Sequence, residues 1–309
     1  MKRALIILSL LLAGGCSMKV SRPVLKFFLA GSNVVRVGAT YADSCRNLRS
    51  VPYVQDGTEM QVMDIFYADD AIRRNAVLID IHGGFYVAGR RENNTPFASV
   101  FLREGYDVVL VEYRHNNGST IDVSHELADC ASALDYLARN ADSLGLNRDR
   151  MFLTGDSAGG HLVLYMAEGS ADKSLPVHPE EFVPAGVMLN CPAYNYGVYG
   201  KSEGFTKGAL KYYIGPRYAD DSWMQSMSPR TYFSSYTGPL LVSTCTRDFI
   251  RGESLLVKAD ADSLGRAIRF VDIASDDRRV SHVHNVIAVN LPESREVNDA
   301  MLEFMEGLL

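Results

Sequence analysis

Short apolar runs alternate with amphipathic segments through most of the chain, from about residue 50 onward. Ala76–Ile81 and Asp107–Glu112 are nearly continuous apolar runs, which are typical of strands buried on both faces. Phe97–Glu104 suits a helix, and Leu127–Asn140 repeats apolar residues at helical spacing. Strands that alternate with helices in this way predict a mostly parallel sheet with helices on both faces.

The rest of this region continues the alternation. An antiparallel pair of strands is predicted first, where Val51–Gln55 and Gln61–Tyr67 flank the turn residues Asp56-Gly57. Four later strands are predicted at Met151–Thr154, Val183–Asn190, Leu240–Thr244 and Ile268–Ile273. Three later helices are predicted at Ala158–Ala167, Ser254–Leu264 and Glu293–Leu309.

One long segment, Pro192–Tyr236, interrupts this rhythm between two predicted strands. It is rich in glycine and in aromatic residues, and long loops inside a compact domain are usually functional. We expect a lid with short helices over an active site, and a purely structural excursion is the alternative. The aromatic residues concerned are Tyr194, Tyr196, Tyr199, Phe205, Tyr212, Tyr213, Tyr218 and Trp223.

Composition adds limits to this picture. The chain has 309 residues, of which 47% are hydrophobic, and single α/β domains of about 200–250 residues are common. One domain over residues 50–309 is therefore expected. The formal net charge of -6 argues against nucleic acid as a partner.

The N-terminus differs from the rest of the chain. Basic Met1-Lys2-Arg3 precedes the apolar run Ala4–Ala13, which suits the hydrophobic region of a signal peptide and is too short to span a bilayer. The following Gly14-Gly15-Cys16 completes a segment that resembles a bacterial lipoprotein signal. That resemblance implies removal of residues 1–15, lipidation of Cys16 and attachment to a membrane surface outside the cytoplasm. An ordinary cleaved signal with a chance cysteine is the alternative.

Between this signal and the predicted domain, residues 17–49 are interpreted as a tether and an accessory helix that Pro23 opens. Four further cysteines follow, and the sequence leaves their state open. An exported protein meets oxidising conditions, which permit a disulfide, whereas cysteines in apolar stretches are usually buried hydrophobic residues. These cysteines are Cys45, Cys130, Cys191 and Cys245.

The strongest chemical signal is Gly155-Asp156-Ser157-Ala158-Gly159-Gly160. It follows a predicted strand and opens a predicted helix, which is the context of a nucleophile elbow. Glycines two positions on either side of Ser157 let neighbouring backbone approach a tight, strained turn. Ser157 is therefore the predicted nucleophile.

A second signal, His82-Gly83-Gly84-Phe85, lies at the end of a predicted strand. Backbone N–H groups in a glycine-rich loop can stabilise the oxyanion that forms during acyl transfer. The predicted donors are the N–H groups of Gly83, Gly84 and Ala158. His82 is expected to shape the loop rather than to act as a base.

These two motifs together resemble the hormone-sensitive-lipase-like branch of the α/β-hydrolases. The resemblance implies the α/β-hydrolase fold: a mostly parallel central sheet flanked by helices, with a lid inserted between late strands. Phe85 stands where the motif of this branch usually has a third glycine. The resemblance also implies a catalytic acid after the next-to-last strand and a histidine after the last.

Asp248 occupies the expected place of the acid, and its role would be to orient the imidazole and to stabilise the imidazolium. Two histidines follow the last predicted strand. The order around them, ahead of Leu291-Pro292, resembles a family stretch whose first histidine is catalytic, which favours His282 over His284. The chain order Ser157, Asp248, His282 is the order of this fold.

The predicted activity is hydrolysis of carboxylic esters through an acyl-enzyme, on a small acyl group or an acylated carbohydrate. A formamidase-like amide hydrolase and a catalytically silent, surface-anchored binding protein are the alternatives. No cofactor is expected. No metal site is expected either, because His161 and His178 lack partners at ligand spacing and there is no Cys-x-x-Cys.

Overall fold

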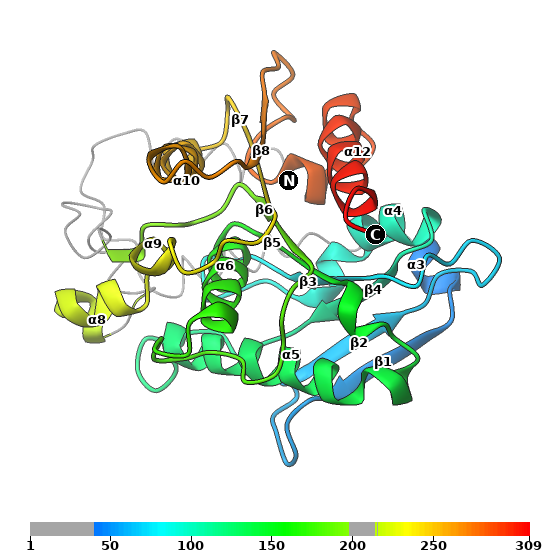
Figure 1. Cartoon of the computed structure of the whole chain (residues 1–309), viewed down its shortest axis with the longest axis horizontal. Coiled ribbons are helices and arrows are strands. Elements are labelled where there is room, and N and C mark those ends of the chain that lie inside the picture. The colour runs from blue at the N-terminus through cyan, green and yellow to red at the C-terminus, as the bar shows by residue number, and fades with distance from the viewer. Residues whose placement is uncertain (1–39, 198–213, 215) are drawn as a thin grey trace.

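The structure, a computed structural model, describes residues 40–197, 214 and 216–309 (Figure 1). The predicted signal peptide, Cys16 and residues 17–39 of the predicted tether and accessory helix lie outside the described residues. The same holds for residues 198–213 and 215 of the predicted lid.

Eight strands of the described residues form one twisted sheet in the order β1-β2-β4-β3-β5-β6-β7-β8. The strands β1 and β2 pair antiparallel, and β2 is antiparallel to β4, whereas every other neighbouring pair is parallel. The predicted α/β-hydrolase sheet is confirmed. The strands are β1 (Asn47–Pro52), β2 (Val62–Phe66), β3 (Val77–Ile81), β4 (Asp107–Val111), β5 (Met151–Asp156), β6 (Gly186–Asn190), β7 (Leu240–Cys245) and β8 (Arg269–Ile273).

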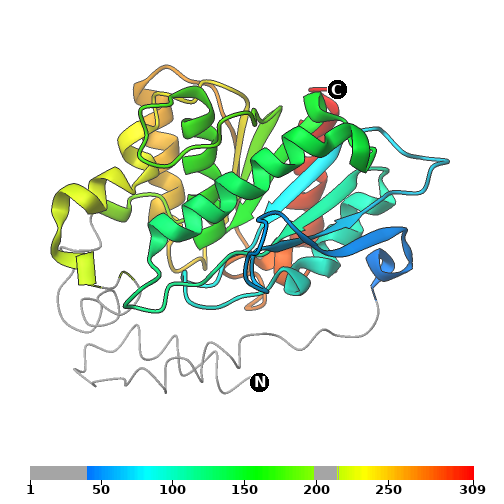
Figure 2. The same cartoon turned by 90° about the horizontal axis from the view of Figure 1, so that it is seen from below.

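Helices cover both faces of this sheet and enclose two separate hydrophobic cores. The core on one face takes apolar side chains from α5, α6, α8 (Asp221–Ser226) and α10. In Figure 2, α5 and α6, in green, lie side by side. The other core takes them from α3, α4, α11 and α12. The longer helices are α4 (Thr95–Arg103), α5 (Val123–Leu144), α6 (Ala158–Ala171), α10 (Arg251–Ser263) and α12 (Pro292–Glu306). The short ones are α3 (Tyr41–Ser44), η1 (Arg91–Asn94), η2 (Arg148–Arg150) and α11 (His284–Ile287).

Several boundaries differ from the prediction, among them those of β1, which spans Asn47–Pro52 rather than Val51–Gln55. Two of these differences have a plain physical reason. The helix α5 begins four residues before the predicted Leu127, because Asp122 accepts a hydrogen bond from the N–H of Ser124 and so caps a polar first turn. The strand β6 begins three residues later than predicted, at Gly186. Val183, which precedes it, is 67% exposed, so its apolar side chain contributes nothing to the buried strand.

The described part of the predicted lid contains short helices: η4 (Pro216–Ala219), α8 (Asp221–Ser226) and α9 (Pro229–Tyr232). His161 on α6 connects to this segment, because its Nε2 lies 2.8 Å from the carbonyl oxygen of Met227. Its Nδ1 lies 2.7 Å from the Tyr86 hydroxyl, so His161 is a bonded core residue. A lid function for the segment stays a prediction. Among the described helices, none has the length and apolar character that a membrane span requires.

Candidate active site

Ser157 lies at a strained turn between β5 and α6. Its backbone has φ 55° and ψ -117°, a conformation that is rare for a residue with a side chain and that typically costs about 1–3 kcal/mol. A Cβ added to Gly159 would lie 1.9 Å from the carbonyl oxygen of Ile81, and one added to Gly155 would lie 2.5 Å from that of Gly159. Both glycines are therefore required by close backbone approach, as expected for a nucleophile elbow.

The structure pairs Asp248 with His282. Asp248 follows β7, His282 follows β8, and His282 Nδ1 lies 2.6 Å from Asp248 Oδ1. The same Oδ1 accepts the N–H of Ile250 at 3.0 Å, and Oδ2 accepts the Thr244 hydroxyl at 3.1 Å. Burial acts to raise the pKa of Asp248, but the hydrogen bond and charge of His282 outweigh it and lower that pKa. Asp248 is therefore an ionised partner for the imidazole at neutral pH.

The bond to Asp248 also decides which nitrogen of His282 is available. A carboxylate only accepts, so Nδ1 carries a proton and Nε2 is left as the base of the neutral ring. His282 Nε2 is buried and has no hydrogen-bond partner among the residues that the structure describes. This is the arrangement that a general base for a serine hydroxyl requires.

The turn after β6 connects the nucleophile to the histidine. Ser157 donates its N–H to the carbonyl oxygen of Asn190 at 2.9 Å, and its own carbonyl oxygen accepts the N–H of Ala193. Between them, Cys191 Sγ accepts the N–H of Val283 at 3.4 Å, directly after His282. Ser157 and His282 therefore border the same turn.

His284, the competing histidine, is placed differently. It is 1% exposed within α11, and its Nδ1 lies 3.2 Å from the carbonyl oxygen of Ser281. Its charge and a hydrogen bond act on the Cys245 thiol rather than on Asp248. The geometry favours His282 as the base.

The oxyanion loop requires one correction. The N–H of Gly83 donates to Asp156 Oδ1 at 3.1 Å, so it is not available to a substrate oxygen. Gly84 has φ 143°, and its N–H has no acceptor among the described residues. Ala158 is the first residue of α6, where a backbone N–H has no acceptor within the helix. The candidate donors are therefore Gly84 and Ala158, without Gly83.

Several residues that the sequence did not single out hold this loop against the elbow. Asn94 donates from Nδ2 to Asp156 Oδ1 at 3.0 Å and to Asp80 Oδ2 at 2.8 Å. The Tyr113 hydroxyl donates to the carbonyl oxygen of His82 at 2.7 Å. Asp156 lies inside the recognised serine motif. Asn94 ends η1 and Tyr113 lies in the loop after β4, so both are distant from that motif in the chain and carry no local signal.

The His82 side chain pairs with Glu112 rather than with a residue of the candidate triad. Its Nε2 lies 2.9 Å from Glu112 Oε1, and both side chains are buried. Burial acts to lower the pKa of His82, but the Glu112 carboxylate and the Gly83 carbonyl outweigh it and raise that pKa to about 9. His82 is therefore protonated at neutral pH and unsuited to act as a base.

An aromatic pair stands beside the candidate base. The rings of Phe85 and Phe249 are stacked, with centroids 5.8 Å apart and planes at 12°. The Phe249 ring centroid lies 4.3 Å from that of His282, and Phe249 is 51% exposed. Phe85 directly follows the oxyanion loop, so the pair forms an apolar rim next to the reacting groups.

A strained serine at a strand-to-helix turn, an acid after β7 and a histidine after β8 define an α/β-hydrolase. The chain falls in the hormone-sensitive-lipase-like branch of that class. More specifically, it belongs to the BD-FAE family, whose model matches residues 63–251.

Known proteins share sequence or fold with this chain. The chain is 26% identical to Esterase LipQ of Mycobacterium tuberculosis over 202 residues, which is 62% of this chain and 47% of LipQ. It thus spans about half the length of that curated relative. Esterase B from Lactobacillus rhamnosis superposes with a TM-score of 0.80 at 22% identity, covering 93% of this chain and 94% of the other. A truncated carbohydrate esterase from gut microbiota gives a TM-score of 0.69 at 16% identity, covering 87% and 100%.

Proposed function

We propose that this protein is a serine hydrolase that cleaves carboxylic esters through an acyl-enzyme intermediate. The observation that carries the proposal is the pairing of His282 with the buried Asp248 carboxylate, which leaves His282 Nε2 as a free base bordering the same turn as Ser157. Ser157 is the proposed nucleophile, His282 the general base and Asp248 the acid that orients it.

The mechanism follows from these positions. His282 Nε2 removes the hydroxyl proton as Ser157 Oγ attacks the ester carbonyl, and the Asp248 carboxylate stabilises the imidazolium that forms. The N–H groups of Gly84 and Ala158 donate to the tetrahedral oxyanion, and one such donor is typically worth roughly 3 kcal/mol of barrier. The alcohol leaves with the proton from His282. Water then attacks the acyl-enzyme by the same steps, which frees the acid and regenerates Ser157.

The proposed substrate is an ester with a small acyl group or an acylated carbohydrate. Two observations support this class. The stacked rings of Phe85 and Phe249 give an apolar rim beside His282, which suits a short acyl chain or the face of a sugar ring. A carbohydrate esterase is also among the proteins that share the fold.

A chain-length series tests the activity. Initial rates on p-nitrophenyl acetate, butyrate and octanoate, beside release of acetate from acetylated xylan, are expected to be highest for the short esters or for the glycan. Ser157→Ala is expected to abolish turnover on every substrate while it keeps the thermal unfolding temperature close to wild type. Absence of wild-type activity on the whole series would favour a silent binding protein on this scaffold instead.

For location, we propose export and lipid attachment through Cys16, which lies outside the described residues. The support is the sequence alone: a basic start, a short apolar run and Gly14-Gly15 before the cysteine. Expression of the full chain with a radiolabelled fatty acid is expected to label the wild type and to leave Cys16→Ser unlabelled. Equal labelling of both proteins would overturn this proposal without touching the enzymatic one.

A further inference from the structure

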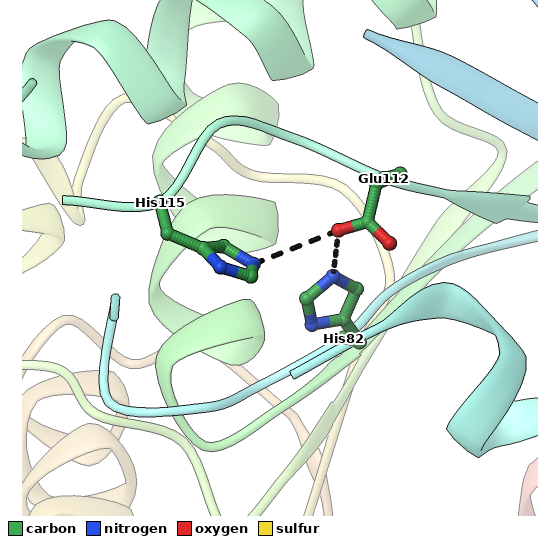
Figure 3. Close-up of side chains that lie close together, drawn as sticks. All are labelled: His82, Glu112 and His115. Carbon is green, nitrogen blue, oxygen red and sulfur yellow. Dashed lines mark hydrogen bonds and ion pairs between the residues drawn. The ribbon is translucent and has the colours of Figure 1, made fainter. Parts of the chain in front are cut away.

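Three potential metal ligands meet at the ends of two neighbouring strands (Figure 3). His82 directly follows β3 and Glu112 directly follows β4. These strands are parallel neighbours in which Ile81 pairs with Val111, so the register sets the two side chains next to each other. His115 comes three residues after Glu112 and turns its ring back toward the same carboxylate, as Figure 3 shows.

The ring of His82 is fixed in the orientation that a metal ligand needs. Its Nδ1 lies 2.8 Å from the carbonyl oxygen of Gly83, which only accepts, so Nδ1 carries a proton. The Tyr113 ring stacks on it with centroids 4.6 Å apart, which holds the imidazole plane. A metal-binding histidine typically donates its other ring N–H to a carbonyl or carboxylate in this way.

The third side chain is not satisfied by the contacts around it. His115 Nε2 is buried and has no hydrogen bond among the described residues, because Glu112 Oε1, at 3.6 Å, is beyond hydrogen-bond distance. The same Oε1 also faces His82 Nε2 at 2.9 Å. One carboxylate oxygen is thus approached by two imidazole nitrogens, a geometry that a shared cation explains.

We propose that His82, Glu112 and His115 bind a divalent first-row transition metal ion, with Zn²⁺ as the test ion. Their three candidate ligand atoms all lie within 4.8 Å of one another. Zn²⁺ binds histidine nitrogen and carboxylate oxygen at about 2.0–2.2 Å in tetrahedral geometry, so two of its ligands stand roughly 3.4 Å apart. Binding displaces the proton from His82 Nε2, small side-chain rotations close the site, and water completes the coordination. Two histidines and one carboxylate are an established donor set for such ions.

Charged neighbours fix the Glu112 carboxylate in place. Glu112 Oε2 already accepts the N–H of Arg91 at 3.2 Å, which leaves Oε1 to face the two histidines. The Arg91 guanidinium forms ion pairs with the carboxylates of Asp64, at 3.2 Å, and Glu92, at 3.3 Å. Asp64 also forms an ion pair with Arg49. The Arg91 guanidinium also lies 3.6 Å from Glu112 Oε2, and Arg90 places a further positive charge near His115, so the carboxylates and guanidinium groups next to the site balance. His115, at 18% side-chain exposure, provides access from solvent.

Such an ion would brace the start of the oxyanion loop, because His82 is followed at once by Gly83 and Gly84. The proposal is independent of ester hydrolysis, since none of the three ligands is assigned a step in it. Sequence spacing concealed the cluster: 30 residues separate His82 from Glu112, and only the pairing of β3 with β4 brings them together.

Metal content and affinity test the site in the full-length protein. After dialysis against EDTA, titration with zinc chloride by calorimetry is expected to give one ion per chain and a rise in the unfolding temperature. Removal of a residue that only hydrogen-bonds to a metal ligand typically lowers the metal affinity 10–100-fold. His115→Gln removes a proposed ligand itself, so it is expected to weaken zinc binding by at least about a hundredfold. His125→Gln is the matched control, because His125 is 42% exposed and pairs with Asp122 at the start of α5.

Two further variants separate this site from the catalytic centre. Cys191, Asp248 and His282 also place potential ligand atoms within 4.8 Å of one another, so Cys191→Ser tests that second set. Ser157→Ala is expected to bind zinc as tightly as wild type. The proposal is overturned if the wild type takes up no zinc, if His115→Gln binds as tightly as His125→Gln, or if only Cys191→Ser loses the ion.

Discussion

Replacement of Asp248 by asparagine removes one charge from the candidate active site and little else. The amide oxygen, placed at the Oδ1 position, still accepts the N–H of Ile250 and Nδ1–H of His282. The amide nitrogen then stands at the Oδ2 position, where the Thr244 hydroxyl turns to accept from it. The tautomer of His282 is therefore retained in Asp248→Asn, and only the negative charge is lost.

The magnitude follows from that charge. The carboxylate and the imidazolium that forms in the transition state, joined by a 2.6 Å hydrogen bond, have their charge centres about 4 Å apart. At an effective dielectric constant near 20, that attraction is about 4 kcal/mol. Each 1.36 kcal/mol is a factor of ten in rate, so Asp248→Asn is expected to lose about a thousandfold in kcat. Asp248→Ala also loses the orienting hydrogen bond, worth about 1 kcal/mol, and is expected to fall several-fold further.

The assay is kcat on p-nitrophenyl butyrate for wild type, Asp248→Asn and Asp248→Ala, with circular dichroism to show that each is folded. The expected order is wild type, then asparagine, then alanine. An asparagine variant within about threefold of wild type refutes the electrostatic role of Asp248. If Asp248→Ala is faster than Asp248→Asn, asparagine does not keep the His282 proton on Nδ1, and that part of the reasoning is refuted.

Three other outcomes are expected. Gly84→Ala places a Cβ 1.9 Å from the carbonyl oxygen of Ala88, so this variant should lose at least about a hundredfold in kcat. The control Gly252→Ala, which has no atom within 4 Å of the added Cβ, should keep full activity. Comparable losses in the two variants would contradict the account of the loop. Burial raises the pKa of Glu168 well above its usual range, so the unfolded chain loses this proton first and stability falls as the pH rises above about 4. Glu168→Gln should therefore flatten the fall in unfolding temperature above that pH, and an unchanged slope would count against this account. His284→Gln should retain kcat within about tenfold of wild type on p-nitrophenyl butyrate, and a loss as large as that of His282→Gln would reassign the base.

Much of this architecture was predictable because its signals are local. A strand buried on both faces, such as β3 or β4, must be apolar along its whole length, and both were predicted within one residue of their bounds. The elbow is equally local, since the strain at Ser157 and the close approach at Gly159 require particular residues at fixed spacing. The sequence therefore indicated the fold and the nucleophile together.

Other features depend on contacts between distant parts of the chain, and spacing does not reveal them. Gly83 was a reasonable oxyanion donor until the structure showed its N–H bound to Asp156, 73 residues away. The choice between His282 and His284 rests on which of them meets Asp248 in space. The sequence predicted no metal site because no histidine or cysteine has a partner at ligand spacing along the chain. The cluster of His82, Glu112 and His115 is instead assembled by the pairing of β3 with β4.

The central claim is that Ser157 is the nucleophile, and covalent labelling tests it most directly. Wild-type protein is incubated with a fluorophosphonate probe, the intact mass is followed over time, and the modified peptide is sequenced. The account predicts a single adduct on Ser157, no adduct in Ser157→Ala, and much slower labelling in His282→Gln. An adduct on any other residue, or labelling of Ser157→Ala at the wild-type rate, would contradict it.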